Sequence, residues 1–193
     1  MLGAIIGDIA GSVYEWNNIK TKDFPLFSPG CRFTDDTVMT LAVASACFSY
    51  RYLKSIGAFQ TMLVQEMQRL GRQYSDRGYG SRFFGWLMSD HPQPYHSFGN
   101  GSAMRVAPVA WTAASLEEAE RLAKASAEVT HNHPEGIRGA QAAGSRVDRD
   151  VDRMGVGPAA RDLDPRKRAD DVGGESVEAP PVDLGDGDGR RVL

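Results

Sequence analysis

The segment from Phe33 to Thr37 has the most evident chemical potential, because a threonine is followed there by two adjacent aspartates. The hydroxyl of Thr34 and the carboxylates of Asp35 and Asp36 are oxygen ligands of the kind that Mg²⁺ and Mn²⁺ prefer. The same residues also suit the start of a helix, since threonine is a good N-cap and carboxylates in the first turn complement the helix dipole. The fragment alone leaves both interpretations open.

Two further carboxylates, Asp8 and Glu15, precede this segment. Asp8 interrupts an apolar stretch, so its side chain is expected to be hydrogen-bonded, ion-paired or bound to a cation. Glu15 follows seven residues later, which is about two helical turns, so both carboxylates can lie on one face of a helix. A surface position is the simpler interpretation of Glu15 taken by itself.

Residues 98–105 read FGNGSAMR and have the composition of a phosphate-binding loop. Glycines on both sides of Asn100, followed by Ser102, suit a loop whose backbone N–H groups hold an anion. No lysine follows the glycines, which excludes a Walker loop. An ordinary turn fits the pattern equally well.

The segment THNH places His131 and His133 at a spacing that zinc ligands can adopt. No cysteine pair and no HExxH helix accompanies them, so the pattern disfavours a structural zinc site. Helix capping or a histidine that faces a ligand is the favoured interpretation.

The elements that must position these residues are predicted to be helices, because the apolar residues follow helical spacing and no segment alternates like a strand. Glycines at every fourth position of the first helix predict a ridge that another helix can approach closely. The second helix is apolar on nearly every side and is predicted to be central and buried. The fourth predicted helix begins with a capping-box pattern, which has Ser115 at the N-cap and Glu118 at N3. The predicted helices span 2–13, 34–52, 57–74, 115–129 and 135–144.

Composition limits the function classes. The chain has 193 residues, a net charge of −3 and 41% hydrophobic residues, which favours a globular protein over one built to bind nucleic acid. No apolar run approaches the roughly 18 residues of a membrane span, and the N-terminus is a poor signal peptide. Cys31 and Cys47 lack metal-type or disulfide-framework spacing, which suits a reducing compartment. We therefore expect a cytoplasmic protein without a nucleic-acid or membrane partner.

Composition changes abruptly after Gly144. Residues 145–193 contain no aromatic residue and no Ile, Cys, His, Asn, Gln or Thr. Such a segment cannot bury enough apolar surface to offset its ordering entropy, so the chain is divided into a helical domain, 1–144, and a low-complexity tail, 145–193. Runs of Arg, Asp, Gly and Val are also typical of GC-rich DNA translated out of frame, which suggests a frameshift near residue 144. Translation of the gene in all three frames tests this hypothesis.

The motifs GDxxGSxxE, FTDDT, GNGSAMR and THNHPEG occur in this order over about residues 1–143. In this the chain resembles the ADP-ribosylglycohydrolase family, which includes the dinitrogenase-reductase-activating glycohydrolases and the J1-type crystallins. The resemblance implies an all-α orthogonal helical bundle around a binuclear Mg²⁺ or Mn²⁺ centre. It also implies a hydrolase that removes ADP-ribose from a modified protein or small molecule by cleaving an N- or O-glycosidic bond.

The resemblance assigns roles on the metal side to five residues. Thr34, Asp35 and Asp36 are expected as metal ligands, and the two aspartates also as part of the catalytic centre. Glu15 is the expected acidic residue near the scissile bond, acting either as a base toward water or as an acid toward the leaving group. Asp8 is expected to support the metal ligands.

Six residues are expected on the substrate side, from the same resemblance. The phosphates of ADP-ribose are assigned to Asn100, Gly101 and Ser102. Gly99 shapes that loop. Phe98 and His131 are expected on the nucleotide side.

The family's remaining metal ligands lie near its C-terminus, in a pattern like GGDSDT. The nearest match is Gly185–Gly189, where Asp186 and Asp188 keep the spacing but a glycine replaces the threonine. The bundle is therefore expected to be incomplete, through truncation or frameshift, and its activity depends on these ligands. A non-catalytic nucleotide-binding or crystallin-like protein and a phosphate-binding helical module are the alternatives. The oligomeric state and the ADP-ribosyl linkage stay open.

Overall fold

The computed structural model describes residues 1–153, and within them the chain forms helices and no strand, which confirms the all-α prediction. No helix among these residues is long and apolar enough to cross a membrane. The elements in chain order are α1 (Leu2–Gly11), α2 (Asp35–Leu53), α3 (Ile56–Gln73), α4 (Ser81–Met88), the short 3₁₀ helix η1 (Asn100–Ser102), α5 (Ala107–Thr112), α6 (Leu116–Glu128) and α7 (Pro134–Arg153).

The pairing of α2 with α3 forms the centre of the core. On α3 the fully buried residues Phe59, Leu63 and Met67 are four apart and make one apolar face, as their helical spacing predicts. Their counterparts on α2 include Met39 and Val43, which are also fully buried. The packing of these two helices fixes the direction of α2 and with it the position of its N-terminus.

One face of α2 is exposed, contrary to the prediction of a helix buried all round. Leu41, Phe48 and Tyr52 are 41%, 60% and 48% exposed, and their spacing places them on one side of the helix. Although α2 has apolar residues on nearly every side, the part of the chain that the structure describes does not bury every side of it.

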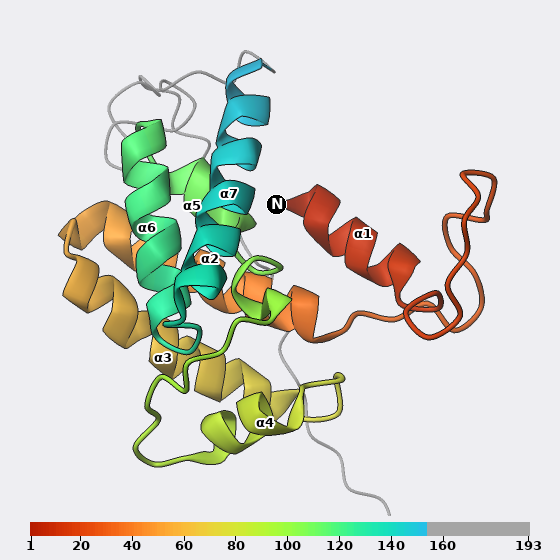
Figure 1. Cartoon of the computed structure of the whole chain (residues 1–193), viewed down its shortest axis with the longest axis horizontal. Helices are drawn as coiled ribbons and strands as arrows, with labels where there is room; N and C mark the ends of the chain where they lie inside the picture. The colour runs from red at the N-terminus through yellow and green to blue at the C-terminus, as the bar shows by residue number, and fades with distance from the viewer. Residues whose placement is uncertain (154–193) are drawn as a thin grey trace, which may run out of the picture. The chain divides into compact units, whose positions relative to one another are not determined.

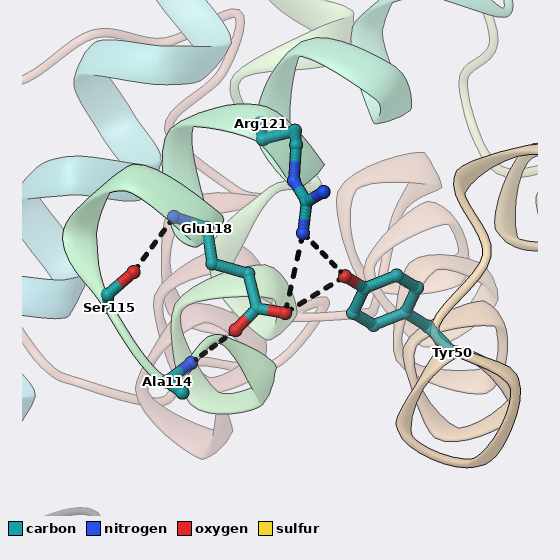
Figure 2. Close-up of polar contacts among 5 residues, drawn as sticks. All are labelled: Tyr50, Ala114, Ser115, Glu118 and Arg121. Atoms are coloured by element: carbon teal, nitrogen blue, oxygen red, sulfur yellow. Dashed lines mark hydrogen bonds and ion pairs between the residues drawn. The ribbon is translucent and has the colours of Figure 1, made fainter.

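The helices α6 and α7 lie side by side, and α5 packs against both (Figure 1). Ser115 caps α6 as its sequence predicts, because its hydroxyl accepts the N–H of Glu118. Figure 2 shows that Glu118 in turn accepts the N–H of Ala114 and the hydroxyl of Tyr50, which also receives a hydrogen bond from Arg121. This network connects the start of α6 to α2.

The helix α7 continues to Arg153, past the predicted boundary at Gly144. The remainder of the tail, with Asp186 and Asp188, lies outside the described residues. The frameshift hypothesis therefore stays a prediction.

The first helix contacts α2 and ends at Gly11, two residues earlier than predicted (Figure 1). A Cβ added at Gly3, Gly7 or Gly11 meets no atom within 4 Å. No described helix therefore packs closely on the glycine ridge, and that prediction is wrong for residues 1–153. Side-chain hydrogen bonds from Asp8 to the start of α2, described below, join the two helices instead.

Candidate active site

The start of α2 is built around the carboxylate of Asp8. Its Oδ2 accepts the backbone N–H groups of Thr34, at 2.8 Å, and of Thr37, at 3.2 Å. Both threonine hydroxyls also donate to this carboxylate, at 2.6 and 2.5 Å. Asp8 thus satisfies backbone donors that a helix N-terminus leaves without intrahelical partners. The expectation that Asp8 is hydrogen-bonded is confirmed.

Thr34 is the N-cap of α2, and its hydroxyl oxygen accepts the N–H of Asp36 at 3.3 Å. Because its proton goes to Asp8, the oxygen retains one further lone pair. Both interpretations of the FTDDT segment, helix cap and oxygen ligand, are therefore compatible with one conformation of Thr34.

Asp35 and Asp36 occupy the first turn of α2 and carry negative charge in partly buried positions. Burial, together with the adjacent charge of Asp36, raises the pKa of Asp35 to about 6. Burial also raises the pKa of Asp36, together with the charges of Asp8 and Glu15. A helix N-terminus favours carboxylate anions, so burial and mutual repulsion outweigh that effect here.

Glu15 lies beyond α1 in an exposed turn, because the helix ends at Gly11. The expectation that Asp8 and Glu15 share one helical face is therefore wrong. The charge of Glu15 still acts on Asp35 and Asp36, so Glu15 adds to the negative charge at the start of α2.

Four carboxylates, called the carboxylate cluster below, are candidates to bind a divalent cation: Asp8, Glu15, Asp35 and Asp36. Their oxygen atoms are of the right type for such an ion, but too few of the side chains lie close together. No ion pair within residues 1–153 neutralises Asp35 or Asp36, and hydroxyl and carboxylate oxygens suit Mg²⁺ or Mn²⁺. Yet no three acidic, histidine or cysteine side chains of the described chain lie close enough together to hold a metal ion. The expectation that Thr34, Asp35 and Asp36 are metal ligands therefore stays a prediction.

A cavity of about 300 Å³ is lined by Asp35, as the one member of this cluster among its lining residues, and by the glycine loop. It is in the size range of small-molecule sites. Its lining comes from the start of α2, the start of α4, the loop before α5 and the turn after α6. The lining residues are Asp35, Gly80, Ser81, Arg82, Phe83, Tyr95, Ser97, Gly99, Asn100, Gly101, Met104, Arg105 and His131. A larger cavity of about 580 Å³, lined by α6 and α7, contains none of the predicted site residues.

Four of the six residues predicted on the substrate side line this cavity, namely Gly99, Asn100, Gly101 and His131. The structure places the other two elsewhere. Ser102 is buried, and its hydroxyl donates to the carbonyl of Gly136 at 2.8 Å, which anchors the loop to α7. Phe98 is 73% exposed, with its ring against His133. Neither side chain is on the cavity wall, so a contact of either with substrate stays a prediction.

His131 and Arg105 are the buried polar residues of the cavity wall. Burial lowers the pKa of His131 to about 4, assisted by the positive charge of Arg105, so the imidazole is neutral at pH 7. Burial lowers the pKa of Arg105 to about 10, which leaves the guanidinium charged at pH 7. No carboxylate of the described residues forms an ion pair with Arg105. The cavity therefore has a cationic end and, at Asp35, an anionic end.

Sequence reasoning missed several of these lining residues, and Arg105 above all. Arg105 closes the FGNGSAMR segment, so its proximity to the glycine loop was the available signal. Arg82 and Tyr95 offered none, since they belong to loop and short-helix segments without a motif. Arg82 lies over the Tyr95 ring and donates to the Tyr95 carbonyl, so these two lining residues hold each other in place.

Comparison with known proteins gives one family and several relatives. Residues 1–169 match the family described as ADP-ribosylglycohydrolase. The protein named ADP-ribosylhydrolase ARH3 from Gallus gallus is 27% identical over 72% of this chain and 46% of its own. The proteins of the same name from Mus musculus and Homo sapiens are each 28% identical over 72% of this chain, and over 45% and 46% of their own. The chain spans about half the length of the curated relatives it matches.

Proposed function

The chain belongs to the ADP-ribosylglycohydrolase family, and from this premise we propose that it binds ADP-ribose and hydrolyses the glycosidic bond that joins it to a protein or small molecule. One observation carries the proposal. A single cavity is lined both by Asp35, from the FTDDT segment, and by the Gly99–Gly101 loop with His131. Motifs far apart in the sequence thus meet around a space for one ligand.

The two ends of the cavity suit the two ends of the proposed substrate. The Gly99–Gly101 loop, His131 and the charge of Arg105 form the end that suits the diphosphate, which is anionic. Asp35 marks the other end, where the ribose and its scissile bond would lie. Glycosidic cleavage passes through an oxocarbenium-like state, which nearby carboxylates stabilise.

The chemistry at the ribose end is assigned to the carboxylate cluster. Thr34, Asp35 and Asp36 would hold Mg²⁺ or Mn²⁺, which when bound supplies Lewis acidity toward ribose hydroxyls and water. Glu15 is exposed to solvent. It would act as general base toward water or as general acid toward the leaving group.

A second candidate function, nucleotide binding without catalysis, is favoured by one specific observation. The described residues provide fewer than three metal-binding side chains of the acidic, histidine or cysteine type in any one place. The cavity itself does not depend on the missing ligands. A chain with this cavity and an incomplete metal site would bind ADP-ribose and leave the bond intact.

Release of ADP-ribose from modified peptides separates the two functions. We expect the full chain with Mn²⁺ to release ADP-ribose from ADP-ribosylated arginine or serine peptides, as detected by mass spectrometry. The Asp35→Asn variant should lose this activity, whereas Asp23→Asn, an exposed control, should keep it. Binding of ADP-ribose without release from either peptide would contradict hydrolysis of these two linkages and support the second function.

The unneutralised charge of Asp35 predicts that Asp35→Asn stabilises the protein when metal is absent. The pKa of Asp35 is raised to about 6 in the folded chain, so the folded state binds the proton more tightly than the unfolded state does. The free energy of unfolding therefore falls as the pH rises from about 4 through 6. In EDTA at pH 7.5, the variant should gain about 1 kcal/mol after allowance for solvent screening. Thermal denaturation measures the gain.

Added Mn²⁺ should reverse the order of the melting temperatures of the wild type and Asp35→Asn. A ligand that binds only the folded state raises the melting temperature, so we expect Mn²⁺ to stabilise the wild type and not Asp35→Asn. Asp23→Asn serves again as control and should respond like the wild type. Identical melting curves of the wild type in EDTA and in Mn²⁺ would contradict the proposed cation site.

A further inference from the structure

The side chains of Arg105, Thr130 and His131 form a buried chain of hydrogen bonds, of which Arg105 and His131 line the cavity. The Arg105 Nη2 donates to the hydroxyl of Thr130 at 3.0 Å and to the carbonyl of Ser126 at 2.7 Å. The Thr130 hydroxyl oxygen lies 2.7 Å from Nδ1 of His131. Thr130 is fully buried, and Arg105 and His131 are 1% and 4% exposed. Solvent therefore does not compete for these hydrogen bonds.

The direction of the chain follows from which atoms can donate. A guanidinium only donates, so the Thr130 oxygen is the acceptor in its contact with Arg105. The hydroxyl then has one proton to give. Within residues 1–153, Nδ1 of His131 is the acceptor in hydrogen-bond range of it. A buried hydroxyl proton without an acceptor is costly, so Nδ1 accepts, and the proton of the neutral imidazole is on Nε2.

We propose that Arg105 and Thr130 are positioning residues that fix His131 as the Nε2–H tautomer and so give the cavity an N–H donor for an anionic phosphate oxygen. This inference rests on the proposed ADP-ribose site for the identity of the ligand. The tautomer itself is a property of the ligand-free protein.

The position of Nε2 supports this assignment. A Cβ added at Gly101 would lie 2.9 Å from Nε2, and one at Gly99 would lie 4.0 Å from it. The Nε2 edge of the ring therefore faces the glycine loop, where backbone N–H groups are proposed to hold the same phosphate. The opposite tautomer would direct a lone pair there and repel the oxygen.

The charge of Arg105 adds to the same effect. Its Nε is buried and has no hydrogen-bond partner in the described chain, and Arg105 forms no ion pair with a carboxylate of residues 1–153. Its positive charge is therefore not neutralised locally and favours an anion in the cavity that both residues line. Together with burial, which has the larger effect, this charge lowers the pKa of the neighbouring imidazole and keeps it neutral.

The tautomer is measured directly by nitrogen-15 NMR of the ligand-free full chain. We expect Nε2 of His131 to show the signal of a protonated nitrogen and Nδ1 that of an unprotonated one at pH 7. His133 is an internal reference, because its Nδ1 accepts the N–H of Glu135 at 3.1 Å. A proton on Nδ1 of His131, or a doubly protonated ring, would overturn the proposal without any variant.

Two substitutions of Thr130 then separate positioning from packing. Thr130→Val keeps the shape and removes the hydroxyl, so the His131 signals should shift toward a mixture of tautomers while those of His133 stay. Affinity for ADP-ribose, measured by calorimetry, should fall about tenfold, which corresponds to one hydrogen bond to a charged group. Thr130→Ser restores the hydroxyl and should restore both signals and affinity.

The outcomes distinguish this inference from the proposed function. Unchanged tautomer and affinity in Thr130→Val would overturn the positioning role. A wild type that shows the Nε2–H tautomer but binds no ADP-ribose would contradict the proposed function and, with it, the ligand assigned to the donor.

Discussion

Replacement of Asp8 by alanine is expected to lower the free energy of unfolding by about 3 kcal/mol, because one carboxylate caps α2 and joins it to α1. The backbone N–H groups and hydroxyls of Thr34 and Thr37 all donate to Asp8. Without it, four donors at the start of α2 must find water or remain unsatisfied. Chemical denaturation measures the loss.

The same variant should also release α1. No described helix packs on the glycine ridge of α1, so amide hydrogen exchange of residues 2–11 should rise toward that of an unprotected helix. Asp23→Ala is the matched control, since Asp23 is exposed and lies outside the helices of residues 1–153. Unchanged exchange and stability in Asp8→Ala would show that other contacts hold the helix.

Gly101→Ala is expected to weaken ADP-ribose binding about 30-fold, or about 2 kcal/mol, while the protein stays folded. The new Cβ would lie 2.9 Å from both Nε2 and Cε1 of His131. The ring cannot move away freely, because Thr130 holds its other side at 2.7 Å. The loop or the ring must therefore shift, and the phosphate end of the cavity changes shape. Calorimetry with ADP-ribose measures the effect.

Gly99→Ala is the control in the same loop. Its added Cβ meets the hydroxyl oxygen of Ser97 at 3.6 Å, an ordinary contact, and its φ of −66° suits any residue. This variant should bind ADP-ribose within about threefold of the wild type, a difference below 1 kcal/mol. Equal affinities of the wild type and Gly101→Ala would place the phosphates away from this loop.

The longer helices were predictable because their signals are local, whereas the short helices α4 and α5 were not predicted. Apolar spacing on α3 and the N-caps Thr34 and Ser115 depend on neighbours within about one turn, and each occurs where the sequence predicts it. The glycine ridge was a weaker signal, since close packing requires a partner helix that the ridge itself does not specify.

The site was predictable only in part, because its contacts join distant segments. The need of Asp8 for partners follows from its apolar surroundings, but its partners, Thr34 and Thr37, do not. Arg105 is buried through contacts with α6 and the turn after it, which no spacing in the sequence reveals. Glu15 shows the opposite case, where helical spacing failed because α1 ends before it.

Titration of the full chain with ADP-ribose in the presence of Mn²⁺ tests the central claim most directly, namely that the cavity between Asp35 and His131 is an ADP-ribose site. We expect saturable binding of one ADP-ribose per chain, which weakens in Gly101→Ala and persists in Gly99→Ala. A folded wild-type chain that binds no ADP-ribose would contradict this claim. Equal affinities of the Gly101→Ala and Gly99→Ala variants for ADP-ribose would contradict it as well.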